Sequence, residues 1–189
     1  VAGEWMGVKI FFNERGIFKP TEINNSSGLW QCVYTTDING DGFTDLLAGN
    51  WGKNSKLYSG KDGAVRLYVK DFDGNGVLEC IPTKYMVDKD GKLKEFTAHV
   101  RDDVVDQMPF IKKRFLSYKE FANVTFDKLF TDGELKDTIK CRANFFKNSF
   151  IRNNGNGKFT LTQLPASVQT TMINGMIVED FDGDGNLDV

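Results

Sequence analysis

Short runs rich in β-branched and aromatic residues recur along most of the chain, and such runs predict β-strands. They lie at 8–12, 32–36, 66–70, 145–151 and 175–179, each followed by residues that favour turns, such as Asn, Asp and Gly. A further hairpin is predicted where 80–87 turns through 88–91 into 92–98. We therefore expect a mainly β chain built from antiparallel hairpins.

The period of the apolar residues changes from 2 to 3.6 between about 102 and 140, which predicts helices there. One apolar stripe comprises Val104, Val105, Met108, Ile111 and Phe115, with Pro109 placed to start or kink a helix. Ser117 and Thr131 each stand three residues before a glutamate and so form capping boxes at two helix starts. The residues predicted to face inward after Ser117 are Phe121, Val124, Leu129 and Phe126.

One nine-residue pattern occurs three times, at 37–45, 71–79 and 180–188. Oxygen-bearing side chains stand at positions 1, 3, 5 and 9, and glycine stands at positions 4 and 6. Calcium takes six to eight oxygen ligands, and a tight loop with side chains at alternate positions supplies them. The side-chain ligands predicted from this pattern are Asp37, Asn39, Asp41, Asp45, Asp71, Asp73, Asn75, Glu79, Asp180, Asp182, Asp184 and Asp188.

The backbone carbonyl of position 7 completes each predicted calcium shell, and these carbonyls belong to Phe43, Val77 and Asn186. The sequence therefore predicts up to three Ca²⁺ ions. A single Asp–Gly stretch is typical of a solvated turn, but three copies in register favour metal binding. The strand-like flanks favour strand–loop–strand sites over an EF-hand, whose glutamate at position 12 is replaced here by Ala48 and Pro82.

A second repeat underlies the first. A turn and a Gly-x-Phe follow the strand at 8–12, and Asn154 to Phe159 repeat that arrangement after the strand at 145–151. The first two calcium patterns begin 34 residues apart, whereas the second and third begin 109 apart, so we expect an insertion. We predict blades with two loops over 1–99, a helical insertion over 100–140 and a blade with the third loop over 141–189. Together they form one continuous unit, and the start at Val1 in strand-like sequence suggests a fragment.

Charge and cysteine content narrow the function classes. Ten of the 26 acidic residues stand in the three loops, so apo loops should be poorly ordered. The basic run Lys112 to Arg114 fits a solvated helix face better than a nucleic-acid contact, and no apolar run is long enough to span a membrane. The thiols of Cys32, Cys80 and Cys141 are expected to be buried and structural, since an odd count cannot fully pair.

The loops and their flanks resemble the FG-GAP/VCBS repeats of integrin-α-type β-propellers. The stretch 37–55 resembles the bacterial cell-surface branch that often carries ASPIC/UnbV domains, as do 67–76 and 152–159. The resemblance implies β-propeller-type antiparallel blades, here an incomplete arc, in which calcium stiffens each blade. It also implies an extracellular or cell-envelope location and a scaffold that binds a protein or a glycan.

These features lead us to expect a non-catalytic calcium-binding scaffold. An accessory part of a calcium-dependent carbohydrate-active enzyme is the alternative, with Trp5, Trp30 and Trp51 stacking on sugars, although tryptophans of this kind more often lie in a core. Against the enzyme, no Ser/His/Asp arrangement is apparent, and His99 is the only histidine. Open blade edges also predict association between copies, and the helical insertion could dock a protein.

Overall fold

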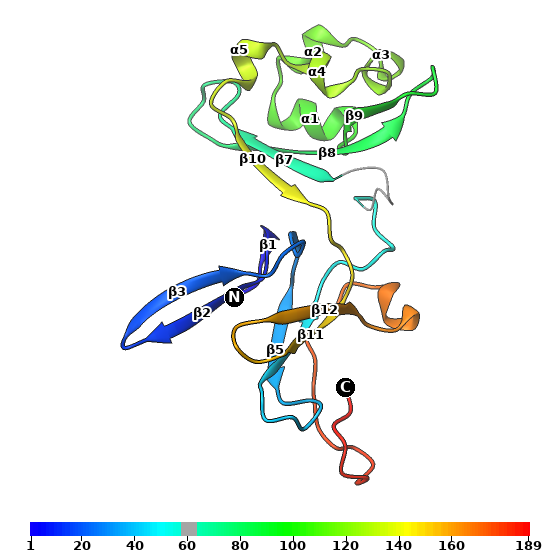
Figure 1. Ribbon diagram of the computed structural model, residues 1–189. Helices are drawn as coiled ribbons and strands as arrows, with labels where there is room; N and C mark the ends of the chain where they lie inside the picture. The colour runs from blue at the N-terminus through cyan, green and yellow to red at the C-terminus, as the bar shows by residue number, and fades with distance from the viewer. Residues whose placement is uncertain (58–63) are drawn as a thin grey trace. The chain divides into compact units, whose positions relative to one another are not determined.

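The computed structural model describes residues 1–57 and 64–189 (Figure 1). About 36% of the residues lie in strands and 15% in helices, so the chain is mainly β, as predicted. Several antiparallel sheets form, and none of them closes into a barrel within the described ranges. The chain divides into two compact units: Val1–Ser55 together with Ala143–Val189, and Lys56–Arg142. Each unit is described by itself.

The first unit contains three sheets. Its strands are β1 (Glu4–Met6), β2 (Lys9–Glu14), β3 (Ile17–Glu22), β4 (Gly28–Leu29), β5 (Cys32–Thr36), β6 (Asp45–Gly49), β11 (Ser149–Asn153) and β12 (Phe159–Gln163), with a 3-10 helix η1 (Ala166–Gln169) after them. The largest sheet has the order β12-β11-β6-β5, and all its neighbouring pairs are antiparallel. The pairs β1–β4 and β2–β3 form two smaller sheets.

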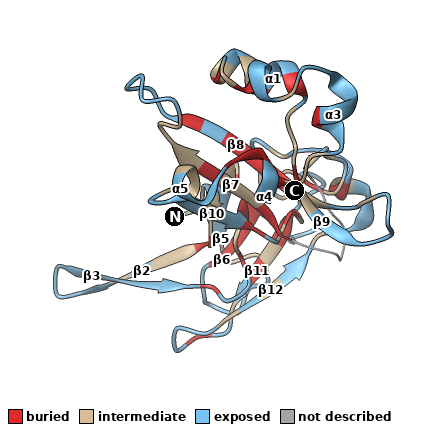
Figure 2. Ribbon diagram, turned by 90° about the horizontal axis from the view of Figure 1, so that it is seen from above, coloured by how far each residue is buried: buried red, intermediate tan, exposed pale blue. Residues whose placement is uncertain are grey.

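The core of the first unit centres on strand β6, whose five residues are all buried. Leu46 and Ala48 pack there with Trp30 and Ile151 in one apolar cluster. The hairpin β2–β3 lies largely outside this core, and every residue of β3 is exposed (Figure 2). Strand β6 therefore anchors the unit, and the first nine-residue loop enters it directly.

Three of the four strands predicted for the first unit lie close to observed strands. The predicted runs at 8–12, 32–36 and 145–151 correspond to β2, β5 and β11, with shifted ends for the first and third. The strand predicted at 175–179 is wrong. That segment has a single bridge, between Glu179 and Asp188, because no neighbouring strand pairs with the rest of it in the described structure.

The second unit consists of a sheet and a layer of short helices. The sheet has the order β10-β7-β8-β9, formed by β10 (Ile139–Ala143), β7 (Val65–Lys70), β8 (Glu79–Val87) and β9 (Leu93–Thr97). The helices are α1 (Arg101–Gln107), α2 (Ile111–Arg114), α3 (Tyr118–Ala122), α4 (Phe126–Leu129) and α5 (Asp132–Leu135). Figure 1 shows these helices gathered over one face of the sheet.

The helical layer and the sheet share one core, as the apolar stripe predicts. Val104, Met108 and Ile111 are fully buried, and Phe121 and Phe126 join them against Tyr68 and Ile81 of the sheet. The two predicted capping boxes are confirmed at Ser117 and Thr131, whose side chains accept from the N–H groups of Glu120 and Glu134. The basic run Lys112 to Arg114 is exposed on α2.

The common core of the helices and the sheet also explains why the two units differ from the predicted division into 1–99, 100–140 and 141–189. The helices pack on β7 and β8, so the second loop belongs with them and not with the first loop.

The prediction for the thiols is wrong for Cys80, which is exposed, while Cys32 and Cys141 are half-buried and all three are free. Trp30 is buried, and Trp5 and Trp51 are half-buried. None of the helices in the described ranges has the length and apolar character needed to cross a bilayer.

Candidate metal loops

Each nine-residue loop is closed by an antiparallel pair between the residue before position 1 and the residue at position 9. Thr36 pairs with Asp45, and Lys70 pairs with Glu79, so the residue before position 1 faces position 9. In the third loop the bridge between Glu179 and Asp188 repeats this closure. The three loops are thus equivalent turns, although the third lacks flanking strands.

The carboxylate at position 1 organises the backbone in all three loops. Its Oδ2 accepts from the N–H of the glycine at position 6, at 2.8 Å for Asp37, 2.8 Å for Asp71 and 2.9 Å for Asp180. Its Oδ1 accepts from the N–H at position 5, at 3.1, 3.0 and 3.1 Å respectively. One side chain therefore folds each loop around itself.

Positions 3 and 5 continue the same series. The side-chain oxygen at position 3 accepts from the N–H at position 5, at 2.9 Å for Asn39, 3.1 Å for Asp73 and 3.1 Å for Asp182. The oxygen at position 5 in turn accepts from the N–H at position 7, over 2.7 to 3.0 Å. Such Asx turns explain why only Asp and Asn occupy these positions.

The glycines at positions 4 and 6 are required by backbone conformation. Gly42, Gly76 and Gly185 have φ values of +86°, +87° and +87°, which L-residues with a Cβ rarely adopt. An added Cβ would meet nothing within 4 Å at any of the three. The constraint is therefore the positive φ, and not a lack of space.

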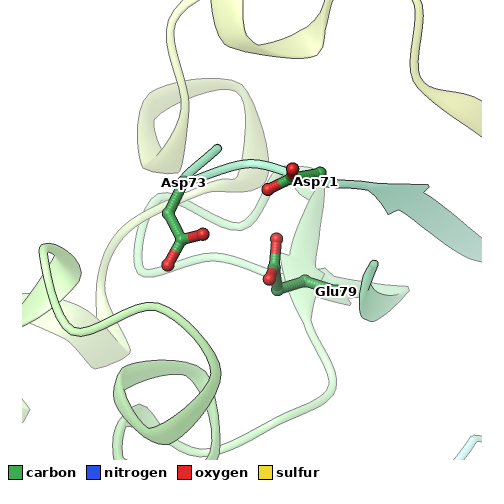
Figure 3. Close-up of side chains that lie close together, drawn as sticks. All are labelled: Asp71, Asp73 and Glu79. Atoms are coloured by element: carbon green, nitrogen blue, oxygen red, sulfur yellow. The ribbon is translucent and has the colours of Figure 1, made fainter. Parts of the chain in front are cut away.

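In the second and third loops, positions 1, 3 and 9 bring three carboxylates together. The groups are Asp71, Asp73 and Glu79, and Asp180, Asp182 and Asp188, with one oxygen of each residue within 4.8 Å of those of the other two. Figure 3 shows the first group turned toward a common space inside the loop. Asp184, at position 5, does not join its group.

A backbone hydrogen bond holds the carboxylate of position 9 over each of these two loops. The N–H of Phe72 donates to Glu79 Oε2 at 2.7 Å, and the N–H of Phe181 donates to Asp188 Oδ2 at 3.1 Å. The longer side chain of Glu79 therefore makes the same contact as aspartate. Glu79 is buried, whereas Asp188 is exposed.

The first loop has different partners, supplied by the β11–β12 hairpin. Asp45 Oδ1 accepts from the N–H of Asn153 at 2.8 Å, and Asp41 Oδ2 pairs with Arg152 Nη2 at 3.0 Å. Asp45 is only 1% exposed, and its Oδ2 has no hydrogen-bond partner. Among the described residues, the acidic side chains of this loop form no group of three like those above.

Hydrogen bonds keep several loop carboxyls ionised. The N–H of Phe43, and then Arg152, lower the pKa of Asp41 below its ordinary value. Backbone N–H groups, that of Gly76 first, lower the pKa of Asp71, and Asn186 lowers the pKa of Asp184. These groups are therefore anionic at neutral pH, which is the state that a metal ligand requires.

The donor set fits a hard cation. Every side chain at positions 1, 3, 5 and 9 offers oxygen, and a carboxylate has about four lone-pair sites, so one that accepts an N–H can still bind a metal. Three carboxylates this close repel one another unless a cation neutralises them. The buried, unpartnered Oδ2 of Asp45 likewise lacks compensation from the protein. All three observations suit a hard divalent cation.

Sequence reasoning missed the residues that distinguish the first loop. Arg152 and Asn153 contact it from more than 100 residues away, and no local motif marks them. The position-7 carbonyls of Phe43, Val77 and Asn186 stay predicted ligands, as do the side chains at position 5.

Comparison of the chain with protein-family models, curated proteins and solved structures finds no match.

Proposed function

We propose that this chain is a non-catalytic binding scaffold whose three loops, at 37–45, 71–79 and 180–188, each hold one Ca²⁺ ion. The proposal rests chiefly on one observation: three separate segments adopt the same hydrogen-bonded turn, and two of them gather three carboxylates within 4.8 Å. A solvated turn needs no such gathering of like charges. A divalent ion bound there would offset their repulsion and stiffen the turn.

The finer parts of the proposal derive from the resemblance to FG-GAP/VCBS repeats. Under it, the four-stranded antiparallel sheet β12-β11-β6-β5 is a propeller-type blade, stiffened by the ion of the first loop. Extracellular calcium concentrations fill sites of micromolar to millimolar affinity, so a cell-envelope or extracellular location suits such loops. The proposed ligand is a protein or a glycan.

Isothermal titration calorimetry with CaCl₂ tests the metal directly. The wild-type chain should bind Ca²⁺ at up to three sites, and Asp71→Asn and Asp180→Asn should each remove or weaken one of them. Asp88→Asn is the matched control, because Asp88 also accepts two backbone N–H groups, from Asp90 and Lys92, in an ordinary turn. Equal heats for all four proteins would rule out the second and third loops as calcium sites.

A further inference from the structure

A cavity of about 300 Å³ lies within the second unit, between the β8–β9 hairpin and helices α1 and α3. Met86, Phe96, Phe121 and Val124 supply apolar walls, and His99 and Arg101 supply polar groups. This volume is at the lower end of the range for small-molecule sites, which combine apolar walls with a few polar groups. The cavity shares no lining residue with the calcium loops, so a ligand bound there would be independent of the proposed function.

Arg101 is the one charged residue among those described as lining the cavity, and its side chain is 9% exposed. Its Nε donates to the carbonyl of Phe115 at 3.0 Å, and its guanidinium lies 5.2 Å from the centre of the Tyr118 ring. The structure gives Nη2 no hydrogen bond among the described residues. The guanidinium is therefore held in place on one side and retains donor capacity on the other.

The protein compensates this buried cation only weakly. Asp102 is the acidic neighbour, 3.5 Å from Nη1, and its side chain is 57% exposed. An exposed carboxylate at that distance contributes little, because solvent screens the pair. A buried guanidinium is costly unless an anion pairs with it and accepts its hydrogen bonds. The charge of the cavity thus favours an anionic ligand.

His99 adds a second donor. The N–H of Cys80 donates to Gln107 Oε1 at 3.2 Å, which fixes the orientation of the Gln107 amide. The Nε2 of that amide, which can only donate, therefore lies 3.4 Å from His99 Nδ1. Nδ1 therefore accepts, and the imidazole proton lies on Nε2. Burial lowers the pKa of His99, so the ring is neutral at neutral pH and remains a donor. Donors on Arg101 and His99, two of the lining residues, favour acceptors on the ligand.

We propose that this cavity binds a small anionic amphiphile, namely a carboxylate with an apolar body. The carboxylate pairs with the Arg101 guanidinium, whose planar fork matches its two oxygens. The apolar body lies against Phe96, Phe121 and Val124. A single lining cation matches a single negative charge, and the volume of about 300 Å³ suits a small ligand.

Calorimetry with octanoate, octanol and octylammonium on the full chain tests the head group. Octanoate should bind at a single site, and about tenfold or more tighter than the other two, since hydrogen bonds to charged groups contribute more than neutral ones. Arg101→Met should remove this preference. Absence of octanoate binding, or equal binding of octanol, would overturn the proposal.

A pair of tryptophan variants on one helix tests the location without relying on Arg101. Ala122 is exposed and lines the cavity, so Ala122→Trp should obstruct it and weaken octanoate binding at least tenfold while the chain still folds. Lys119 is exposed on the same helix and does not line it, so Lys119→Trp should bind as the wild type does. Unchanged binding in Ala122→Trp would place octanoate elsewhere and refute the assignment. Circular dichroism of each variant checks its fold.

Discussion

At the scale of single residues, Arg152 distinguishes the first loop from the other two. Its guanidinium lies 3.0 Å from Asp41 Oδ2 and is half exposed. The positive charge of Arg152 neutralises part of the negative charge of the loop, and it repels a metal ion that binds nearby. The other two loops have no such ion pair among the described residues.

We therefore predict that Arg152→Gln tightens Ca²⁺ binding at the first loop by about two- to fivefold, a modest gain because the pair is exposed and screened. Lys158→Gln, an exposed cation of the same hairpin that makes none of the described salt bridges, should leave the affinity unchanged. Calorimetry at low salt measures both. Weaker binding in Arg152→Gln alone would show that the arginine supports the site.

Asp45, also in the first loop, is a buried carboxylate with one oxygen that has no hydrogen-bond partner. Asp45→Asn removes the buried charge, so we expect a higher melting temperature in EDTA and a smaller rise on adding Ca²⁺. Asp188→Asn is the matched change at the exposed position 9 of the third loop, and it should barely alter melting in EDTA. A lower melting temperature for Asp45→Asn in EDTA would contradict this account.

At the scale of elements, two glycines of the second unit separate backbone strain from packing. Gly76 has a φ of +87°, whereas Gly133 lies in α5 and does not have a positive φ. Neither would bring an added Cβ within 4 Å of another atom. We expect Gly76→Ala to destabilise by about 1–2 kcal/mol and Gly133→Ala to stabilise by about 0.5–1 kcal/mol. Urea unfolding measures both, and equal effects would show that φ does not control the loop.

The start of helix α5 predicts a pH dependence. Arg114 and the N–H and hydroxyl of Thr131 lower the pKa of Glu134 from 4.5 to about 2. Because the pKa is depressed in the folded state, the contribution of Glu134 is present above pH 4.5 and is lost as the pH falls toward 2. Glu134→Gln should therefore be less stable than wild type at pH 7, and the difference should shrink below pH 4.5. If the difference in unfolding free energy between the two proteins stays constant from neutral pH down to about pH 2.5, the ion pair of Glu134 with Arg114 does not contribute to stability.

Local sequence signals predict most of these elements because each depends on few neighbours. The strand β5, the hairpin β8–β9 and the caps at Ser117 and Thr131 all arise from residues within one turn or one hairpin. The segment 175–179 also contains β-branched residues, Ile177 and Val178, but forms no strand, since a strand also needs a partner. The contacts of Arg152 with the first loop likewise join distant segments, so no local pattern predicts them.

At the scale of the whole molecule, the two units each combine a core with at least one candidate metal loop. The first unit contains the loops at 37–45 and 180–188, and the second contains the loop at 71–79. In the second unit the loop is tied to the helices, because Phe72 stacks on Phe130 with ring centres 4.5 Å apart. Ion binding at that loop should therefore stabilise the helical layer as well as the sheet.

Thermal unfolding with and without EDTA tests the central claim most directly. When free Ca²⁺ exceeds the dissociation constant about 100-fold, each filled site adds about 2.7 kcal/mol, which raises the melting temperature of a chain of this size by roughly 5–10 °C. We predict that EDTA abolishes this rise and that Ca²⁺, in excess over EDTA, restores it. An identical melting temperature in about 5 mM CaCl₂ and in EDTA would contradict the proposal that these loops bind calcium.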